Sequence, residues 1–314
     1  MGSFRRYFST FLLLLGVAPF TGCLFRTRRV EQTISTVALK SAIKPELVAY
    51  INSQAAKIQT MKAKVDIDTS VGGAKKGKVT EYREISGYVL ARQPAMLRMI
   101  GLLPFIRDTA FDMVSDGQEF KLSIPPKNRF FVGRNDVAPP NPQQPLESLR
   151  PQIIYDALLL RAIEANEHAF LTNETETVLG DKGRKLQQPD YVIYVTRTEN
   201  ENQWLSRKII FDRVNLLPDR QLIYDQNGHM VTDVQYSNYK DYDGVLFPSV
   251  IEIRRPEEEY DITLHIVELQ INLKLDDNKF VLEKPPGATE IRLDRQQPAS
   301  SGGGSQLRER GVSR

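Results

Sequence analysis

Three histidines are the residues of this 314-residue chain best suited to acid–base catalysis or metal binding. His168, His229 and His265 lie far apart in the sequence, His229 in a predicted turn and His265 on the polar face of a predicted strand. No cysteine lies near them to complete a metal site, and neither a G-x-S-x-G nor an H-E-x-x-H motif occurs. We therefore predict no catalytic residue, no metal, no cofactor and no enzymatic activity.

One segment has the glycine and lysine spacing of a phosphate-binding loop: Gly72-Gly73-Ala74-Lys75-Lys76-Gly77-Lys78-Val79. Val79 stands where a serine or threonine would bind magnesium, and predicted strands flank the segment where a helix should follow. The pattern therefore predicts a lysine-rich hairpin loop rather than a nucleotide site.

Cys23 is the single cysteine, and it directly follows a hydrophobic leader. Arg5 and Arg6 precede an apolar run at residues 11–17, and the small residues Thr21 and Gly22 precede the cysteine, as in a secretory signal. The apolar stretch is shorter than the roughly 20 residues that a membrane-spanning helix needs. Export leads to an oxidising compartment, but a lone cysteine has no partner for an internal disulfide.

The sequence Thr21-Gly22-Cys23 resembles the lipobox of bacterial lipoproteins, although Phe20 stands where a leucine is usual. The resemblance implies that residues 1–22 are removed and that Cys23 is acylated. Leu24, which is not an aspartate, implies sorting to the outer membrane, with the chain facing the periplasm. An ordinary leftover or buried cysteine is the alternative interpretation.

Charge gives no sign of a nucleic-acid partner. The formal net charge is +3, and loss of two arginines with the leader would leave it at +1. Three arginines that directly follow the cysteine would lie near lipid headgroups and favour anionic ones: Arg26, Arg28 and Arg29. Residues 23–42 then form a tether, and residues 295–314 a disordered tail rich in glycine, serine and arginine.

The body between them, residues 43–294, begins with one predicted helix and continues as strands. Pro45 suits a first helical turn, and apolar residues follow at helical spacing: Leu47, Tyr50, Ile51, Ala55 and Ile58. From Met61 the apolar period changes to two, and tight turns separate further strands at residues 81–92, 95–101, 109–115, 119–124, 191–198, 206–212, 221–224, 231–239, 250–254 and 262–275. The last of these changes phase, so a bulge is predicted near Ile266. Strands joined without helices predict an antiparallel sheet.

A second helix interrupts this sheet. It follows a proline-rich loop and is apolar almost all round: Ile153, Ile154, Ala157, Leu158, Leu159 and Leu160. Such a helix should be covered on more than one side.

Three short segments carry a family resemblance: residues 238–253, 280–288 and 87–101. They resemble, in that order, the strand-turn-strand motif of the carriers, the segment that closes such domains, and the paired early strands of the receptor and its relatives, all of the LolA/LolB superfamily of lipoprotein carriers and receptors. The resemblance implies a mainly β (α+β) fold, in which a curved antiparallel sheet forms an incomplete barrel covered by the N-terminal helix and the inserted apolar helix. It also implies an apolar cavity for acyl chains, with Ile153, Ile154, Leu158 and Leu159 as its lid. Ordinary core packing is the alternative for these four residues.

The connection at residues 102–108 is unusually apolar for a hairpin loop: Leu102, Leu103, Phe105 and Ile106. In the lipoprotein receptor the matching loop carries a protruding leucine that accepts cargo and inserts it into the membrane. The resemblance therefore implies a ligand-binding, membrane-inserting loop, and the alternative is that these residues fold inward.

These observations predict an anchored periplasmic protein that binds acyl chains of lipoproteins or phospholipid and transfers them by relative affinity, at about 0.8 kcal/mol per buried CH₂. A periplasmic carrier protein is an expected partner. The first rival is an anchored interaction or scaffold module whose interior is filled by side chains, since these aromatic residues would line or plug a cavity: Phe111, Phe120, Phe130, Phe131 and Tyr194. The second rival is an envelope hydrolase built around His168 or His265.

Overall fold

The structure is a computed structural model that describes residues 38–73, 75, 77–135, 150–179 and 185–293. The predicted leader, Cys23, most of the tether and the predicted tail lie outside the described residues. The chain forms two compact units: a main unit of residues 37–175 and 189–314, and a small unit of residues 1–36 and 176–188. Of the small unit, the structure describes only the continuation of two strands, β7 and β8.

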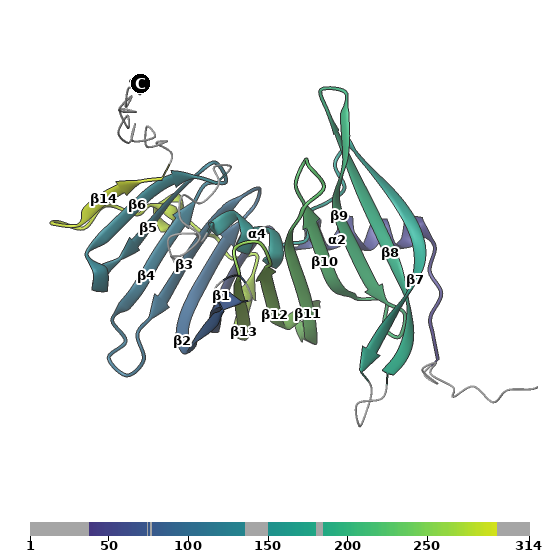
Figure 1. Cartoon of the computed structure of the whole chain (residues 1–314), viewed down its shortest axis with the longest axis horizontal. Coiled ribbons are helices and arrows are strands. Elements are labelled where there is room, and N and C mark those ends of the chain that lie inside the picture. The colour runs from purple at the N-terminus through teal and green to yellow at the C-terminus, as the bar shows by residue number, and fades with distance from the viewer. Residues whose placement is uncertain (1–37, 74, 76, 136–149, 180–184, 294–314) are drawn as a thin grey trace, which may run out of the picture. The chain divides into compact units, whose positions relative to one another are not determined.

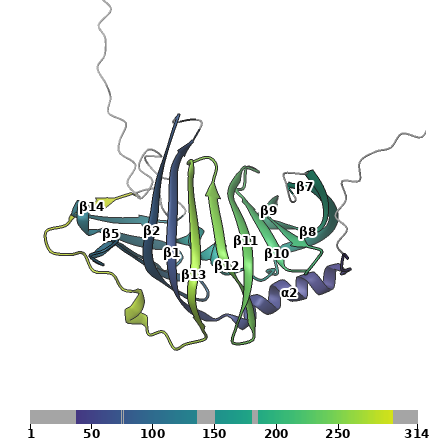
Figure 2. The same cartoon turned by 90° about the horizontal axis from the view of Figure 1, so that it is seen from below.

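One fourteen-stranded sheet contains every described strand (Figures 1 and 2). Its order is β14-β6-β5-β4-β3-β2-β1-β13-β12-β11-β10-β9-β8-β7, and β7 and β14 lie at its two ends, so the sheet is not closed. The first meander comprises β1 (Thr60–Gly73), β2 (Lys78–Arg92), β3 (Met96–Leu102), β4 (Thr109–Ser115), β5 (Glu119–Ile124) and β6 (Arg129–Arg134). The second comprises β7 (Glu167–Leu179), β8 (Lys185–Glu199), β9 (Asn202–Asp212), β10 (Pro218–Tyr224), β11 (Met230–Tyr242), β12 (Val245–Arg255) and β13 (Tyr260–Ile271). The mainly β prediction is confirmed.

The two meanders are joined by antiparallel pairing of β1 with β13, although nearly 200 residues separate these strands. The register shifts between Lys64 and Val65, opposite Val267. Because this bulge inserts one residue, Ile266 and Leu269 both face the core despite the change of phase. The predicted bulge near Ile266 is therefore confirmed.

Two α-helices occur in the described part of the chain, and both pack on the same face of the sheet, the core face. α2 (Lys44–Lys57) buries Leu47 and Ile51 against β8 and β9, which confirms the predicted N-terminal helix (Figure 2). α4 (Pro151–Leu158) lies between the meanders. None of the described helices is long and apolar enough to cross a membrane.

The predicted extent of the second helix is wrong at its end. α4 ends at Leu158, and Leu159 already has an extended backbone. Beyond it Arg207 binds the carbonyl oxygens of Arg161 and Ala162, which are therefore satisfied without a continued helix. Leu159 packs with α4, while Leu160 packs with the cluster beneath α2.

The opposite face of the sheet is partly covered by the segment that follows β13. This segment contains a short 3-10 helix, η3 (Asp277–Phe280), and ends in β14 (Thr289–Arg292), which pairs parallel to β6. Leu282 and Ala288 pack on Val114 and Phe130 in a separate apolar cluster. Phe130 therefore lies on the far side of the sheet from α4 and cannot line or plug a cavity beneath it, which corrects that expectation.

The glycine- and lysine-rich segment forms the β1–β2 hairpin, as predicted. β2 follows it directly, so no helix N-terminus is present to hold a phosphate. Gly72 has a φ of 104°, and a side chain there would meet the carbonyl oxygen of Lys78. The glycine spacing is thus explained by the turn.

Candidate functional site

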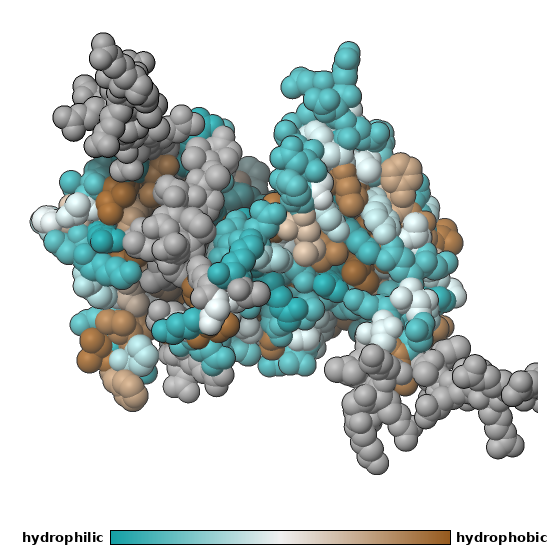
Figure 3. Space-filling model, in the orientation of Figure 1, coloured by the Kyte–Doolittle hydropathy of each residue, from teal (hydrophilic) through white to brown (hydrophobic). Residues whose placement is uncertain are grey.

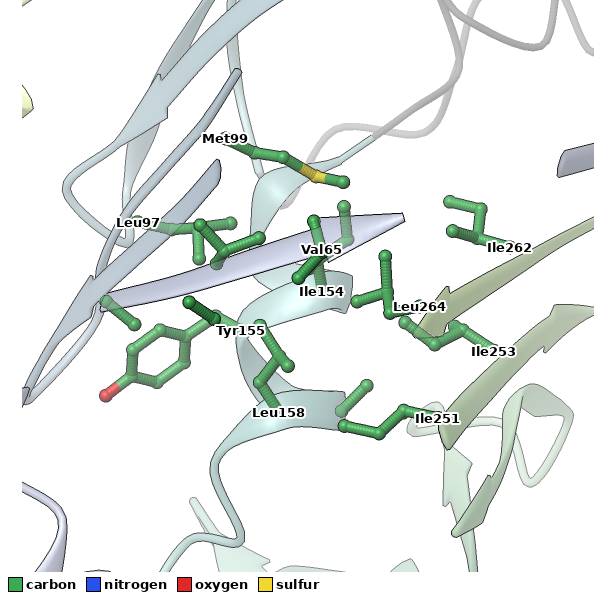
Figure 4. Close-up of a cluster of buried hydrophobic side chains, with 14 of the residues drawn as sticks. Val65, Leu97, Met99, Ile154, Tyr155, Leu158, Ile251, Ile253, Ile262 and Leu264 are labelled. Atoms are coloured by element: carbon green, nitrogen blue, oxygen red, sulfur yellow. The ribbon is translucent and has the colours of Figure 1, made fainter. Parts of the chain in front are cut away.

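α4 packs against an apolar surface formed by both meanders (Figure 4). Ile154 and Leu158 are 0% and 3% exposed. Around them lie side chains of four strands: Val65, Leu97, Met99, Ile251, Ile253, Ile262 and Leu264. Of the four predicted lid residues, Ile154, Leu158 and Leu159 are buried beneath or beside α4, and Ile153 is half-buried. The structure therefore brings these four residues together on the core face.

Side chains fill the interior in this conformation. Phe111, Phe120 and Phe131 are buried in the same cluster as α4, and the ring of Phe111 lies where a side chain at Gly101 would have to be. The cleft between α2 and α4 holds about 50 Å³. Sites for small molecules typically occupy about 300–1,000 Å³, so an acyl chain does not fit unless α4 moves.

The lining of this cleft is nonetheless mostly apolar and aromatic, with Gln54 and Gln93 as its amide side chains. Its walls come from both helices and from β10 to β12: Tyr50, Ala55, Ile58, Leu158, Leu159, Leu160, Tyr236, Tyr239, Leu246 and Phe247. Leu246 is 44% exposed and lies at its margin.

Three sheet side chains hold the backbone at the C-terminal end of α4. Tyr236 Oη donates to the carbonyl oxygen of Ala157 over 3.0 Å, and Gln221 Nε2 donates to that of Asp156 over 3.2 Å. Arg207 donates to the carbonyl oxygens of Arg161 and Ala162, both over 2.8 Å. The last carbonyl groups of a helix lack partners within it. Tyr236 and Gln221 satisfy two of them in α4, and Arg207 holds the chain just beyond the helix.

A buried ion pair forms the centre of this attachment. Arg207 Nη2 lies 2.8 Å from Glu167 Oε2, and the two side chains are 2% and 0% exposed. Arg197 binds the other oxygen of Glu167 over 3.0 Å and also contacts Glu164. Burial raises the pKa of Glu167, but Arg207 and the further hydrogen bonds outweigh burial and hold it below its ordinary value. Glu167 is therefore a stable anion.

The pKa of Asp156 is shifted in the opposite direction, above its ordinary value. Burial raises the pKa of this carboxyl group, and Arg161, 3.5 Å away, only partly offsets that effect. Two carboxyl groups near the C-terminal end of α4 thus differ. The surroundings stabilise the ionised form of Glu167 and destabilise that of Asp156.

The apolar loop between β3 and β4 projects into solvent. Phe105 is 101% exposed and Ile106 is 65% exposed, whereas Leu102 and Leu103 are half-buried at its base. Figure 3 shows the resulting apolar patch at the end of this hairpin, at the lower left. Backbone bonds between Leu103 and Asp108 close the loop, so Phe105 and Ile106 do not fold inward.

The backbone of Phe105 is strained. Its φ is 68°, in the left-handed region that costs an L-residue about 1–2 kcal/mol, and Arg107 has a φ of 55°. We expect Phe105→Gly to raise the free energy of unfolding by about 0.5–1 kcal/mol, because a fully exposed ring loses no packing when it is removed. Arg107→Gly should give a similar gain. Denaturant unfolding followed by the fluorescence of Trp204, the single tryptophan, measures both changes. A loss of stability in either variant would contradict the strain argument.

The remaining candidates do not converge on a site. His168 is exposed on β7, His229 lies 3.3 Å from Asp225 in the β10–β11 turn, and His265 lies 3.4 Å from Asp68 on the face opposite the core. No group of three metal-ligating side chains occurs among the residues that the structure describes. The expectation that Tyr194 lines or plugs the interior is wrong, because its side chain points away from the core and bonds Glu174.

Sequence reasoning missed the charged attachment of α4. Arg207 occupies a core-facing position of β9, where alternation calls for an apolar residue, and Glu167 begins a strand that sequence reasoning also missed. A charged residue at a core-facing position of an otherwise apolar strand was the available signal.

Comparison with known proteins shows the fold alone. A family model described as "Uncharacterized protein" matches residues 161–284. No curated protein matches the chain in sequence. A DUF1329 family protein from Desulfovibrio piger is 16% identical over 75% of this chain and 95% of that chain, with a TM-score of 0.50. A LolA superfamily protein from Nitrosomonas europaea is 13% identical over 75% of this chain and 97% of that chain, with a TM-score of 0.46. The chain is thus similar in overall fold to the Desulfovibrio protein.

Proposed function

We propose that this protein is a membrane-anchored carrier of the bacterial envelope that binds acyl chains of lipoproteins or phospholipid beneath α4. One observation carries the proposal: α4, two turns long, covers an apolar surface built from β1, β3, β12 and β13. If α4 swings away, that surface becomes an acyl-chain site without any further rearrangement of the sheet. Transfer by relative affinity requires no covalent step.

The attachment of α4 suggests how it opens. Its C-terminal end is held by Tyr236, Gln221 and Arg207. Its N-terminal end begins at Pro151, and Arg150 stacks on the ring of Phe120, 4.8 Å from the ring centre. A pivot about the fixed C-terminal end would lift the N-terminal end of α4 and uncover the apolar sheet surface beneath Ile154.

In this proposal Cys23 is the lipidated anchor and the β3–β4 loop exchanges cargo with the outer membrane, on its periplasmic side. Leu102 and Leu103 support the loop, and Phe105 and Ile106 enter the bilayer. We expect Phe105→Gly to slow transfer of a fluorescent acyl probe to vesicles, whereas Arg107→Gly keeps the apolar tip and the wild-type rate. Equal rates in both variants would contradict insertion by this loop.

Mass spectrometry of the full chain carrying Cys23→Ser tests ligand binding. The substitution removes the acylation site, and a leader that an ordinary signal peptidase removes replaces residues 1–22, so the protein can be purified from the envelope without detergent. We expect a stoichiometric lipid or acylated peptide in native spectra, released on denaturation and identified by lipid extraction. A ligand-free mass that no added lipid shifts would remove the carrier proposal.

The filled interior favours one alternative, an anchored interaction module of an envelope assembly. Phe111, Phe120 and Phe131 occupy the space that a ligand would need, and the remaining cleft holds only about 50 Å³. This alternative predicts the ligand-free mass. It also predicts that a cross-linkable residue at the exposed Ile106 captures an envelope protein rather than lipid.

A further inference from the structure

We propose that the surface at the start of α2 is a docking site for an anionic phospholipid bilayer. The surface, called here the α2 entry patch, consists of Leu39, Lys40, Ile43, Lys44, Arg213 and Val214. Ile43 is 60% exposed, and Leu39 and Val214 are each 36% exposed. The proposal rests on the proposed function for its anchor at Cys23, and it assigns an orientation that the anchor alone does not impose.

The patch is a built surface rather than a mobile end. Lys40 N–H donates to the carbonyl oxygen of Arg213 over 2.7 Å, and Arg213 Nε returns a bond to Lys40 over 3.3 Å. Arg213 also lies over the ring of Tyr191, 4.6 Å from its centre. The apolar side chains of the segment before α2 and of the β9–β10 turn are therefore held next to each other.

Its cations remain available to an anionic partner. Lys40 Nζ and Lys44 Nζ each contact only a backbone carbonyl oxygen, of Asn215 at 3.4 Å and of Ala169 at 3.5 Å. Within the described part of the chain, neither forms an ion pair with a carboxylate. The two nearby carboxylates are engaged by backbone amides, Glu46 by that of Ile43 and Asp212 by that of Val214.

Exposed apolar side chains among cations suit the interface of an anionic bilayer, where apolar groups enter the acyl boundary and cations meet headgroups. A protein partner would more commonly be recognised by an aromatic or arginine-rich centre with a polar rim, and the patch has no exposed aromatic side chain. The chemistry therefore favours a lipid surface.

The position of the patch in the chain supports the same partner. Cys23 precedes Ala38 by fifteen residues, which span at most about 50 Å when fully extended. A tether of this length keeps the patch at an effective concentration of roughly millimolar near the anchoring membrane, so a weak surface affinity is enough for docking.

Depth-dependent quenching tests the contact in the full acylated chain. Acylation blocks Cys23, so an Ile43→Cys variant takes an environment-sensitive fluorophore at one site. The matched control is Val267→Cys, which replaces an apolar residue of similar exposure, 48%, on the opposite face of the sheet. Both proteins are reconstituted in vesicles of phosphatidylethanolamine and phosphatidylglycerol that contain brominated acyl chains.

We expect strong quenching at residue 43 and little at residue 267. Adding Lys40→Glu and Lys44→Glu should abolish the quenching at residue 43, as should replacing phosphatidylglycerol by phosphatidylcholine. Absence of quenching at residue 43, or equal quenching at both sites, would overturn the proposal. Self-quenching that grows with surface density would show that the α2 entry patch binds a second copy of the chain, and would overturn the proposal that it binds lipid.

The acyl-chain proposal is measured separately. Lys40→Glu with Lys44→Glu, placed in the Cys23→Ser chain, should keep the bound lipid seen by mass spectrometry, because neither lysine lines the cleft beneath α4. Loss of docking with retained lipid supports the patch alone. Retained docking without any bound lipid would leave the patch standing and remove the carrier proposal.

Discussion

Glu167→Gln should lower the free energy of unfolding by about 3 kcal/mol, the largest effect we expect from a single isosteric substitution in this protein. The variant keeps the shape of the side chain but removes its charge. Arg207, 2% exposed, is then left as a buried cation, and Arg197 loses one of its carboxylate partners but keeps Glu164. Denaturant unfolding followed by Trp204 fluorescence measures the loss.

Glu174→Gln is the matched control. Glu174 pairs with Lys208, the neighbour of Arg207 in β9, at 2.6 Å, but its side chain is 38% exposed. Exposed pairs contribute about 0–1 kcal/mol, so the control should remain close to wild type. Equal losses in the two variants would show that burial does not set the strength of the Arg207–Glu167 pair.

The effect of Glu167→Gln should also depend on pH. The pKa of Glu167 is lowered in the folded protein, so its carboxylate stabilises the fold above the unfolded pKa of about 4.3, and this contribution is lost as pH falls through the folded pKa. The difference between wild type and variant should therefore be full near pH 7 and vanish in strong acid. A difference that stays constant down to pH 3 would contradict the assignment of the charge to Glu167.

Ile154→Ala should cost about 3 kcal/mol and, if α4 is a lid, should increase lipid occupancy. Ile154 is fully buried where α4 packs on four strands, so its truncation removes packing and leaves a cavity. The same loss weakens closure of α4 and shifts the population toward the open state, which alone binds an acyl chain. Unfolding curves give the first quantity, and native mass spectrometry of the Cys23→Ser chain the second.

Ile153→Ala controls for the substitution itself. Ile153 is the preceding residue of α4 but is only half-buried, so the loss of stability should be clearly smaller and lipid occupancy should change little. Destabilisation by Ile154→Ala without any bound lipid in either variant would identify α4 as permanent core. That result would favour the interaction module.

The regular parts of this fold were predictable because their periodicity is unambiguous. Residues 44–57 carry apolar residues at helical spacing, and β1 alternates strictly between core and solvent from Met61 to Ile67. β7 was missed because its edge position leaves most of its side chains exposed and polar, with Phe170 and Leu171 adjacent rather than alternating. An edge strand takes its structure from its neighbour, and a periodicity search cannot detect that pairing.

The candidate site was only partly predictable. Ile153, Ile154, Leu158 and Leu159 were recognisable as an apolar group, but whether they close a cavity or fill a core depends on residues far away in the sequence. Arg207 and Glu167 are 40 residues apart, and nothing local to either indicates that they meet. Which face of β6 carries Phe130 and which carries Phe131 also followed from strand register, which the sequence alone left undetermined.

The pairing of β1 with β13 has a consequence for how the chain is made. An exported chain enters its compartment N-terminus first, so β1 to β6 arrive before residues 260–271. During that interval β1 has no neighbour on one side and presents an unpaired row of amide and carbonyl groups, as any sheet edge does. Pairing of β1 with β13 is therefore a late, non-local folding step. The incompletely folded chain depends on protection of β1 until β13 arrives.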